Sequence, residues 1–258
     1  MIQLDKRWDQ VADVLVHYST GVKAGERVMI AMHEIETLPL VRAVYEEAVK
    51  AGAHVQVQFL SEYLKHSLIR YGRKEQIEWV PEIEAYGMEW ADVYFGLRGA
   101  HNLYELADVG PELLAAHQRA LGEISALRWQ KTRWCLVRVP NESFAQQAES
   151  DVETVMDFFF SSILRDWETE AADWRRIANV LGQGEEVRLV GKDTDLRFST
   201  RGRYWLVGDG HVNMPDGEIY TAPVTHTVNG HIYFEFPGVL GGRLVSDIHL
   251  GWKDGQLI

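Results

Sequence analysis

Strand-like and helix-like hydrophobic patterns alternate along the first part of the chain. Arg27–Met32 is almost wholly apolar and predicts a buried strand, and His54–Leu60 alternates apolar with polar residues, which predicts a second strand. Between them, apolar residues recur on one broad helical face behind Thr37, a capping residue, and Pro39, a first-turn proline. A strand, a helix and a strand in so short a span form the crossover that places two parallel strands in one sheet.

The same alternation continues to about residue 182. Further strands are predicted at Ala91–Leu97 and Arg133–Val139. Helices are predicted over residues 5–21, Tyr63–Tyr71, Pro81–Trp90, Pro111–Trp129, Asp151–Arg165 and Thr169–Leu181. This order is typical of the α/β class, and we predict a doubly wound, mostly parallel α/β domain over residues 1–182.

The pattern changes after Gly182-Gln183-Gly184, the expected domain boundary. Short apolar runs separated by turn residues then follow at Val187–Gly191, Leu196–Thr200, Tyr204–Val207, Glu218–Thr221, Gly230–Phe236 and Arg243–Trp252. The dipeptide Asn229-Gly230 favours a tight turn, so we predict a hairpin there. Residues 183–258 are expected to form a β-rich domain, either a sheet or part of a barrel.

Charge and composition limit the classes of partner that we expect the protein to bind. The chain carries 38 acidic against 26 basic residues, a formal charge of −12, and no basic cluster overrides that balance, so nucleic acid is not expected as a partner. Charged residues interrupt the first sixteen positions, and no apolar run is long enough to span a membrane, so we expect a cytoplasmic protein. The single Cys135 lies in an apolar strand and is expected to be buried rather than nucleophilic.

The loop after the first predicted strand indicates that the α/β domain binds no nucleotide. It reads His33-Glu34-Ile35-Glu36-Thr37, with two acids and no glycine, whereas a phosphate-binding turn needs glycines to let backbone N–H groups approach the anion. Polar residues at the ends of the first and third strands, at 33–34 and 98–101, lie where α/β proteins often bind ligands. Such residues are more often simply solvated.

One stretch of the β-rich half combines a sharply shaped backbone with a carboxylate. Residues 212–223 read V-N-M-P-D-G-E-I-Y-T-A-P. Pro215 fixes its own φ and Gly217 can adopt a positive φ, so Glu218 leaves a turn at the beginning of a strand at a defined angle. Metal ligation requires a ligand held in that way. The spacing alone also fits a solvated turn carboxylate.

The segment N-M-P-D-G-E-I-Y-T-A-P resembles the signature of the aminopeptidase T family of metallopeptidases. Stretches at 22–30 (V-K-A-G-E-R-V-M-I), 38–53, 132–140 (T-R-W-C-L-V-R-V-P), 191–199 (G-K-D-T-D-L-R-F-S) and 238–258 are similar to the same family in the same order. The resemblance implies a homodimeric aminopeptidase that removes amino-terminal residues from peptides with two divalent metal ions, zinc or cobalt. It also implies that Glu218 is a metal ligand, with Tyr220 or Thr221 supporting it.

In that family the remaining ligands lie beyond the part that this chain resembles: a second Glu, His and Tyr residues, and a closing His-x-Asp. The 258 residues therefore hold only the first ligand, and we expect little aminopeptidase activity from them alone, because a catalytic zinc takes three protein ligands. A site rebuilt from other residues of the β-rich half is a minor alternative. Its members would be Asp209, His211, His226, His231 and His249.

Two other functions stay open. A branch similar to the same family cleaves hydroxylated pyridine rings with dioxygen at one Fe(II) held by two His and an Asp. The presence of Glu218 favours the peptidase over this dioxygenase. The third interpretation is a truncated, non-catalytic homologue that serves as a subunit or binding module.

Overall fold

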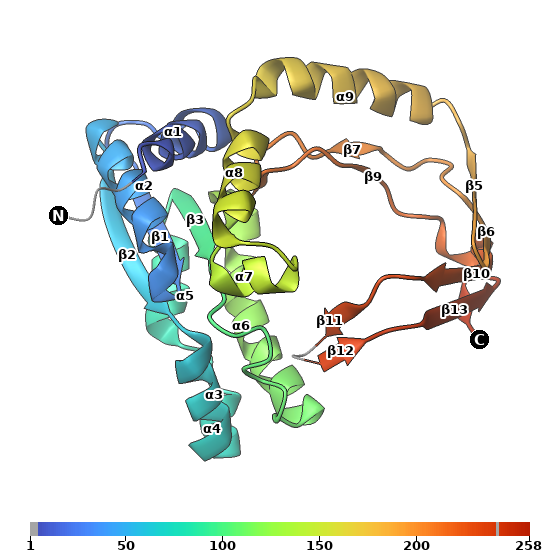
Figure 1. Ribbon diagram of the computed structural model, residues 1–258, viewed down its shortest axis with the longest axis horizontal. Helices are drawn as coiled ribbons and strands as arrows, with labels where there is room; N and C mark the ends of the chain where they lie inside the picture. The colour runs from blue at the N-terminus through green and yellow to red at the C-terminus, as the bar shows by residue number, and fades with distance from the viewer. Residues whose placement is uncertain (1–4, 241–242) are drawn as a thin grey trace. The chain divides into compact units, whose positions relative to one another are not determined.

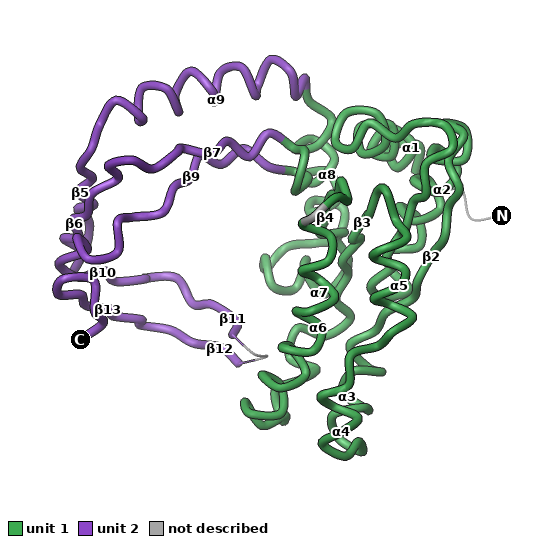
Figure 2. The backbone as a smooth tube through the Cα atoms, turned by 180° about the vertical axis from the view of Figure 1, so that it is seen from behind, with its two compact units in different colours: residues 1–165, 210–215 green, residues 166–209, 216–258 purple. Residues whose placement is uncertain are grey.

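The structure is a computed structural model, and it describes residues 5–240 and 243–258. The chain divides into two compact units (Figure 2). The first comprises residues 1–165 and 210–215, and the second comprises residues 166–209 and 216–258. The chain thus returns to the first unit for one short segment after it has begun the second.

The first unit contains a five-stranded parallel sheet with the order β2-β1-β3-β4-β8. Its strands are β1 (Arg27–His33), β2 (His54–Leu60), β3 (Val93–Arg98), β4 (Arg133–Arg138) and β8 (Asn213–Met214). Because β2 and β3 lie on opposite sides of β1, the sheet is doubly wound, which confirms the predicted α/β class. The strand β8 was not predicted, since two residues carry no pattern of their own.

Helices cover both faces of this sheet (Figure 1). They are α1 (Arg7–Asp13), the π-helix η1 (Val14–Ser19), the 3-10 helix η2 (Ile35–Thr37), α2 (Leu38–Lys50), α3 (Glu62–Tyr71), α4 (Lys74–Ile77), α5 (Glu82–Trp90), α6 (Pro111–Lys131), α7 (Glu142–Gln147) and α8 (Val152–Ile163). On one face, Ala31 and Tyr94 pack against Met88 of α5 and Ile124 of α6. On the other, α1 packs against α2 and α8.

The core of the α1 side is aromatic. The Trp8 ring lies 5.8 Å from that of Phe159 and 4.7 Å from that of Phe160, so α1 and α8 are joined by tilted and edge-on ring contacts. Cys135 is buried, as the sequence predicts, and takes part in no disulfide within the described residues. None of the helices in the described residues combines the length and the apolar character that a membrane crossing needs.

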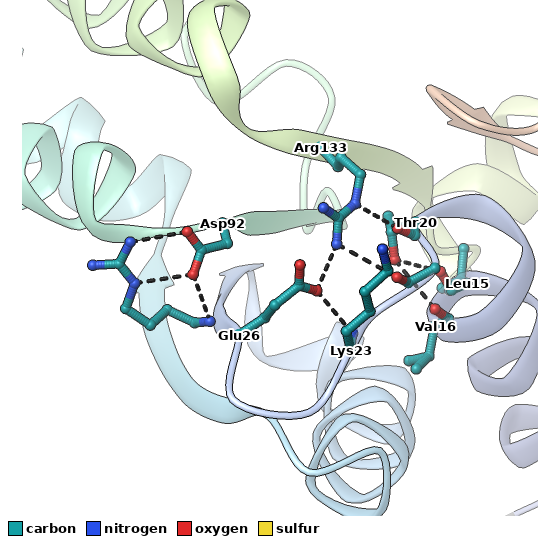
Figure 3. Close-up of polar contacts among 9 residues, drawn as sticks. Leu15, Val16, Thr20, Lys23, Glu26, Asp92 and Arg133 are labelled. Carbon is teal, nitrogen blue, oxygen red and sulfur yellow. Dashed lines mark hydrogen bonds and ion pairs between the residues drawn. The ribbon is translucent and has the colours of Figure 1, made fainter.

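Charged residues tie the amino ends of three strands together (Figure 3). Arg27 at the beginning of β1 donates from its backbone N and its Nε to Asp92 Oδ2, at 2.9 and 3.0 Å, and from Nη2 to Oδ1 at 2.9 Å. Arg133 at the beginning of β4 donates to Glu26 Oε2 at 2.6 Å and to the Thr20 carbonyl at 2.7 Å. The strand register is therefore fixed by fork-shaped, charge-assisted contacts as well as by the apolar core.

These contacts predict a dependence of stability on pH. The hydrogen bonds and charge of Arg27 lower the pKa of Asp92 to about 2. A carboxylate with a depressed folded-state pKa stabilises the fold above its unfolded-state pKa, near 4, and loses that contribution as pH falls toward 2. The Asp92 side chain is one-third exposed, so we expect Asp92→Asn to cost only about 1 kcal/mol at neutral pH. Urea denaturation should show this difference shrinking between pH 4 and pH 2.

The matched control is Glu123→Gln, which changes an exposed carboxylate on α6. Its free energy of unfolding should follow that of the wild type at every pH. A difference between Asp92→Asn and wild type that stays constant down to pH 2 would show that the ion pair makes no contribution.

The second unit begins with α9 (Trp167–Leu181) and continues as an antiparallel, β-rich region. Its larger sheet has the order β14-β13-β10-β6-β5, and two strand pairs, β7 with β9 and β11 with β12, lie outside it. The strands are β5 (Glu186–Gly191), β6 (Thr194–Ser199), β7 (Leu206–Val207), β9 (Ile219–Tyr220), β10 (Asn229–Phe234), β11 (Gly238–Leu240), β12 (Arg243–Val245), β13 (Ile248–Lys253) and β14 (Gln256–Leu257). The predicted β-rich character is confirmed.

One strand of this half differs from the prediction. Arg243–Trp252 was expected to be one strand, but the chain breaks between β12 and β13, where Asp247 has a φ of 54°. The expected boundary at residue 182 assigned α9 to the first domain, whereas α9 packs against β7 and groups with the second unit. The division into domains 1–182 and 183–258 stays a prediction.

The hairpin predicted at Asn229-Gly230 is wrong. Both residues lie within β10 and pair with Arg197 and Leu196 of β6. Gly230 has a φ of 113°, and a Cβ there would lie 2.0 Å from the backbone carbonyl oxygen of Asp195. Asn229 Oδ1 accepts a hydrogen bond from Asp254 N at 2.9 Å. Gly230 therefore allows β10 to approach β6 closely, and Asn229 binds the distant turn at Asp254.

Candidate metal centre

Glu218 closes a loop that begins at the end of β7 and returns at the start of β9. Gly208 N donates to the Glu218 carbonyl oxygen at 2.8 Å, and Gly217 N donates to the Gly208 carbonyl oxygen at 3.0 Å. These bonds continue the antiparallel pairing of β7 with β9. The carbonyl group of Glu218 and the N–H of the residue before it are thus both held by Gly208, directly before β9.

Close contacts fix the backbone before Glu218. Gly217 has a φ of 121°, and a Cβ on it would lie 3.1 Å from the ring of Trp174 on α9. A Cβ on Gly208 would lie 2.1 Å from Asp216 Oδ1. At the start of the loop, Arg175 Nη2 donates to Asp209 Oδ2 at 2.8 Å. Helix α9 therefore supports both ends of the loop, and the peptide bond before Pro215 is cis.

The Glu218 side chain is exposed, which leaves its carboxylate accessible to a cation. The two residues that were expected to support it, Tyr220 and Thr221, have different surroundings. Thr221 Oγ1 donates to the Tyr204 carbonyl oxygen at 2.8 Å, so this hydroxyl binds the segment before β7, and Tyr220 is exposed. The metal-binding role of Glu218 and the supporting roles of Tyr220 and Thr221 remain proposals.

The alternative site in the β-rich half is not assembled in the described residues. Asp209 pairs with Arg175, the His211 ring lies 4.7 Å from that of Tyr18 in the first unit, and the His249 ring stacks on Tyr233 at 4.4 Å. His226 lies in the 3-10 helix η3 (Thr225–Thr227), and His231 lies on β10. Within residues 5–240 and 243–258, no group of three potential ligands includes any of these residues or Glu218.

One group in the described residues does bring three potential ligand atoms within 4.8 Å of one another: Asp13, His17 and Glu47 of the first unit. His17 Nε2 lies 3.0 Å from Glu47 Oε1 and 3.8 Å from Asp13 Oδ1, and Lys50 Nζ lies 3.0 Å from Glu47 Oε2. The hydrogen bonds from His17 and Lys50 lower the pKa of Glu47. The members of this group contact one another, and Lys50 pairs with Glu47. The sequence shows only the four-residue spacing of its first two members.

The polar residues at the carboxyl ends of the strands have structural partners. Glu34 is buried, and its carboxylate accepts hydrogen bonds from Ser61 Oγ, at 2.9 Å, and from Glu62 N at the amino end of α3. The expectation that it is merely solvated is therefore wrong. Burial, with Arg98 and Lys65 nearby, lowers the pKa of His33 to about 4, so this imidazole is neutral at physiological pH.

His101 at the same edge pairs with Glu36, with 2.6 Å between Nδ1 and Oε1. This contact raises the pKa of the imidazole. The strand ends thus hold capped and paired side chains, and the described residues there present no glycine-rich turn for a phosphate.

The first unit is a doubly wound α/β unit and the second is antiparallel, and the sequence match shows the family. Residues 4–258 match the family described as thermophilic metalloprotease (M29), and the chain belongs to that family. It is therefore an enzyme of a metal-dependent peptidase family, and the resemblance to the aminopeptidase T family is confirmed.

Individual relatives agree with this assignment. The chain is 25% identical to Aminopeptidase 2 of Geobacillus stearothermophilus over 291 residues, which covers 100% of this chain and 70% of that protein. It is 22% identical over 281 residues to Aminopeptidase T of Thermus thermophilus, covering 96% of this chain and 68% of that protein.

Solved structures agree on the fold. Wild-type AmpT from Thermus thermophilus superposes with a TM-score of 0.82 at 20% identity, covering 98% of this chain and 70% of that one. A dihydroxypyridine dioxygenase from Pseudomonas putida KT2440 gives a TM-score of 0.57 at 13% identity, covering 97% of this chain and 66% of that one. At these identities the likeness concerns the fold alone.

Proposed function

We propose that this protein is an aminopeptidase that removes amino-terminal residues from peptides with two divalent metal ions, zinc or cobalt, and that Glu218 is one of their ligands. The observation that carries the proposal is the family match over residues 4–258. Three relatives that span nearly the whole chain are named aminopeptidases. We further propose that the protein acts as a homodimer. The cytoplasmic location stays a prediction from the sequence.

The residues of this chain fit only part of such a centre. A carboxylate oxygen suits a divalent cation, and Glu218 is both exposed and held by a braced backbone. A catalytic zinc takes three protein ligands and an open position. The described residues supply no group of three around Glu218, so these residues alone do not fit a complete two-metal site.

This chain therefore contributes to the proposed chemistry by holding the Glu218 ligand in position. A pair of divalent ions supplies Lewis acidity and an activated water when bound. The bonds of Gly208 and Gly217 fix the backbone of Glu218, and Trp174 fills the space beside Gly217. A ligand aimed in advance loses less conformational freedom when it binds an ion.

Metal removal tests the proposal. We expect the protein expressed from its complete gene to hydrolyse leucyl-p-nitroanilide, to lose that activity in a chelator, and to recover it when zinc or cobalt is added back. Hydrolysis that is insensitive to chelation would contradict a metal-dependent mechanism. Oxygen uptake with a dihydroxypyridine, in place of peptide hydrolysis, would support the iron-dependent alternative, for which the structural likeness gives only the fold.

A further inference from the structure

Three side chains on two neighbouring helices of the first unit converge on one point. Asp13 ends α1, His17 lies in the π-helix η1 that follows it, and Glu47 lies on α2. One carboxylate oxygen of each acid and one ring nitrogen of His17 all lie within 4.8 Å of one another. We propose that these three residues bind a divalent transition-metal ion such as Zn²⁺, which links η1 and the end of α1 to α2.

The separations of the three atoms are close to those that a bound ion requires. His17 Nε2 lies 3.0 Å from Glu47 Oε1 and 3.8 Å from Asp13 Oδ1. Zinc bonds to nitrogen and oxygen are about 2.0–2.2 Å long, so two ligand atoms of a tetrahedral zinc ion lie about 3.4 Å apart. The two observed separations lie on either side of this value. The Asp13 side chain is 71% exposed and has room to turn toward the ion.

The packing of the two helices holds the ligands in place. Asp13 and His17 lie four residues apart on one side of their helix, while Leu15 between them is fully buried. Val44, one turn before Glu47 on α2, is also fully buried, and α1 packs against α2 (Figure 1). Sites built on packed helices are held more precisely than sites on loops. The chain also changes from α-helix to π-helix between the first two ligands, and π segments occur frequently at functional sites.

The charge of the group favours a cation. Two carboxylates and a neutral imidazole carry two negative charges, which match a divalent ion. Within the described residues Asp13 makes an ion pair with His17 alone, at 3.8 Å, which is too long for a hydrogen bond. An ion between these two atoms would bind both of them and would separate Asp13 from the like charge of Glu47.

Lys50 orients one of the ligands. Its Nζ lies 3.0 Å from Glu47 Oε2, so the other oxygen, Oε1, is the one directed at His17. Partners of this kind, which hold a ligand without touching the ion, are usual around metal centres. With an ion on Nε2, the imidazole of His17 carries its proton on Nδ1, and the ring is exposed enough to donate that proton to water.

The donor atoms select the kind of ion. An imidazole nitrogen suits zinc, copper and nickel, whereas magnesium and calcium prefer oxygen ligands alone. Three protein ligands leave the fourth position of a zinc ion to water. The inference goes beyond the proposed function and does not depend on it, because Glu218 belongs to the second unit and this group to the first.

Zinc content tests the site. The protein expressed from its complete gene and two variants are brought to equilibrium by dialysis against the same excess of zinc, and bound metal is counted. We expect His17→Ala to bind one zinc ion per chain fewer than the wild type. The matched control His54→Ala removes an exposed histidine of β2 and should bind as much as the wild type. Ions bound elsewhere are common to all three samples, so the difference is independent of Glu218. Equal zinc content in the wild type and His17→Ala overturns the proposal.

Hydrogen exchange tests the link between the helices. An ion that binds only the closed state slows exchange by the factor 1 + [L]/Kd, so zinc at ten times its dissociation constant should slow exchange of α2 about tenfold in the wild type. It should have no such effect in Glu47→Gln. The control Glu46→Gln changes the preceding residue, which pairs with Arg42, and should respond to zinc as the wild type does. Circular dichroism checks that each variant is folded. A wild type that zinc leaves unchanged, or equal slowing in Glu47→Gln, overturns the proposal.

Discussion

Glu218→Gln is expected to reduce aminopeptidase activity at least about 100-fold and to lower the metal content of the purified protein, because the neutral amide is a poor ligand for a divalent cation. The fold should be unaffected, since the side chain is exposed and the bonds that hold the loop are backbone bonds of Gly208, Gly217 and Glu218. The measurement is kcat/KM on leucyl-p-nitroanilide together with metal analysis of the same sample. Circular dichroism confirms the fold.

Glu186→Gln is the matched control for this prediction. It removes the charge of another exposed glutamate of the second unit, which is the first residue of β5. We expect its activity and metal content to equal those of the wild type. Equal losses in both variants would mean that the acidic charge of the unit matters and that Glu218 has no specific role.

Gly230→Ala should destabilise the second unit by about 3 kcal/mol or more. The residue has a φ of 113°, where side chains are strained, and the new Cβ would lie 2.0 Å from the Asp195 carbonyl oxygen. The strands β6 and β10 would have to separate at their shared end. Hydrogen exchange of β10 should accelerate about 100-fold, as expected for a loss of that size in the local opening free energy.

Gly238→Ala provides the comparison, because a Cβ at this position of β11 meets nothing within 4 Å. Its effect should stay within about 0.5 kcal/mol, which is usual for surface positions. If β10 exchanged at the wild-type rate in Gly230→Ala, the close approach of the two strands would not exist in solution.

The sequence predicts the first sheet well because parallel strands are buried on both faces and appear as short apolar runs. Strands such as β1 and β3 needed no further information. By contrast, β8 was missed because its two residues become a strand only by pairing with β4. Asn229-Gly230 was misinterpreted for a related reason, since its local pattern favours a turn while a contact with β6 determines the backbone.

For the candidate site too, the sequence predicted the local backbone but not the long-range contacts. Pro215 and Gly217 showed that the backbone before Glu218 would be sharply shaped, and Gly217 has the positive φ that this requires. The contacts that brace the loop come from Trp174 and Arg175, about forty residues earlier on α9, and no local pattern indicates them. For the same reason, the partners that bury Glu34 could not be predicted from its position after a strand.

The central claim is that the carboxylate of Glu218 binds a divalent metal ion. The most direct measurement is anomalous X-ray scattering from crystals of the protein, expressed from its complete gene and soaked in zinc or cobalt. We expect a peak at about 2.0–2.2 Å from a Glu218 carboxylate oxygen. An occupied metal centre in which the Glu218 side chain is not a ligand would contradict the account.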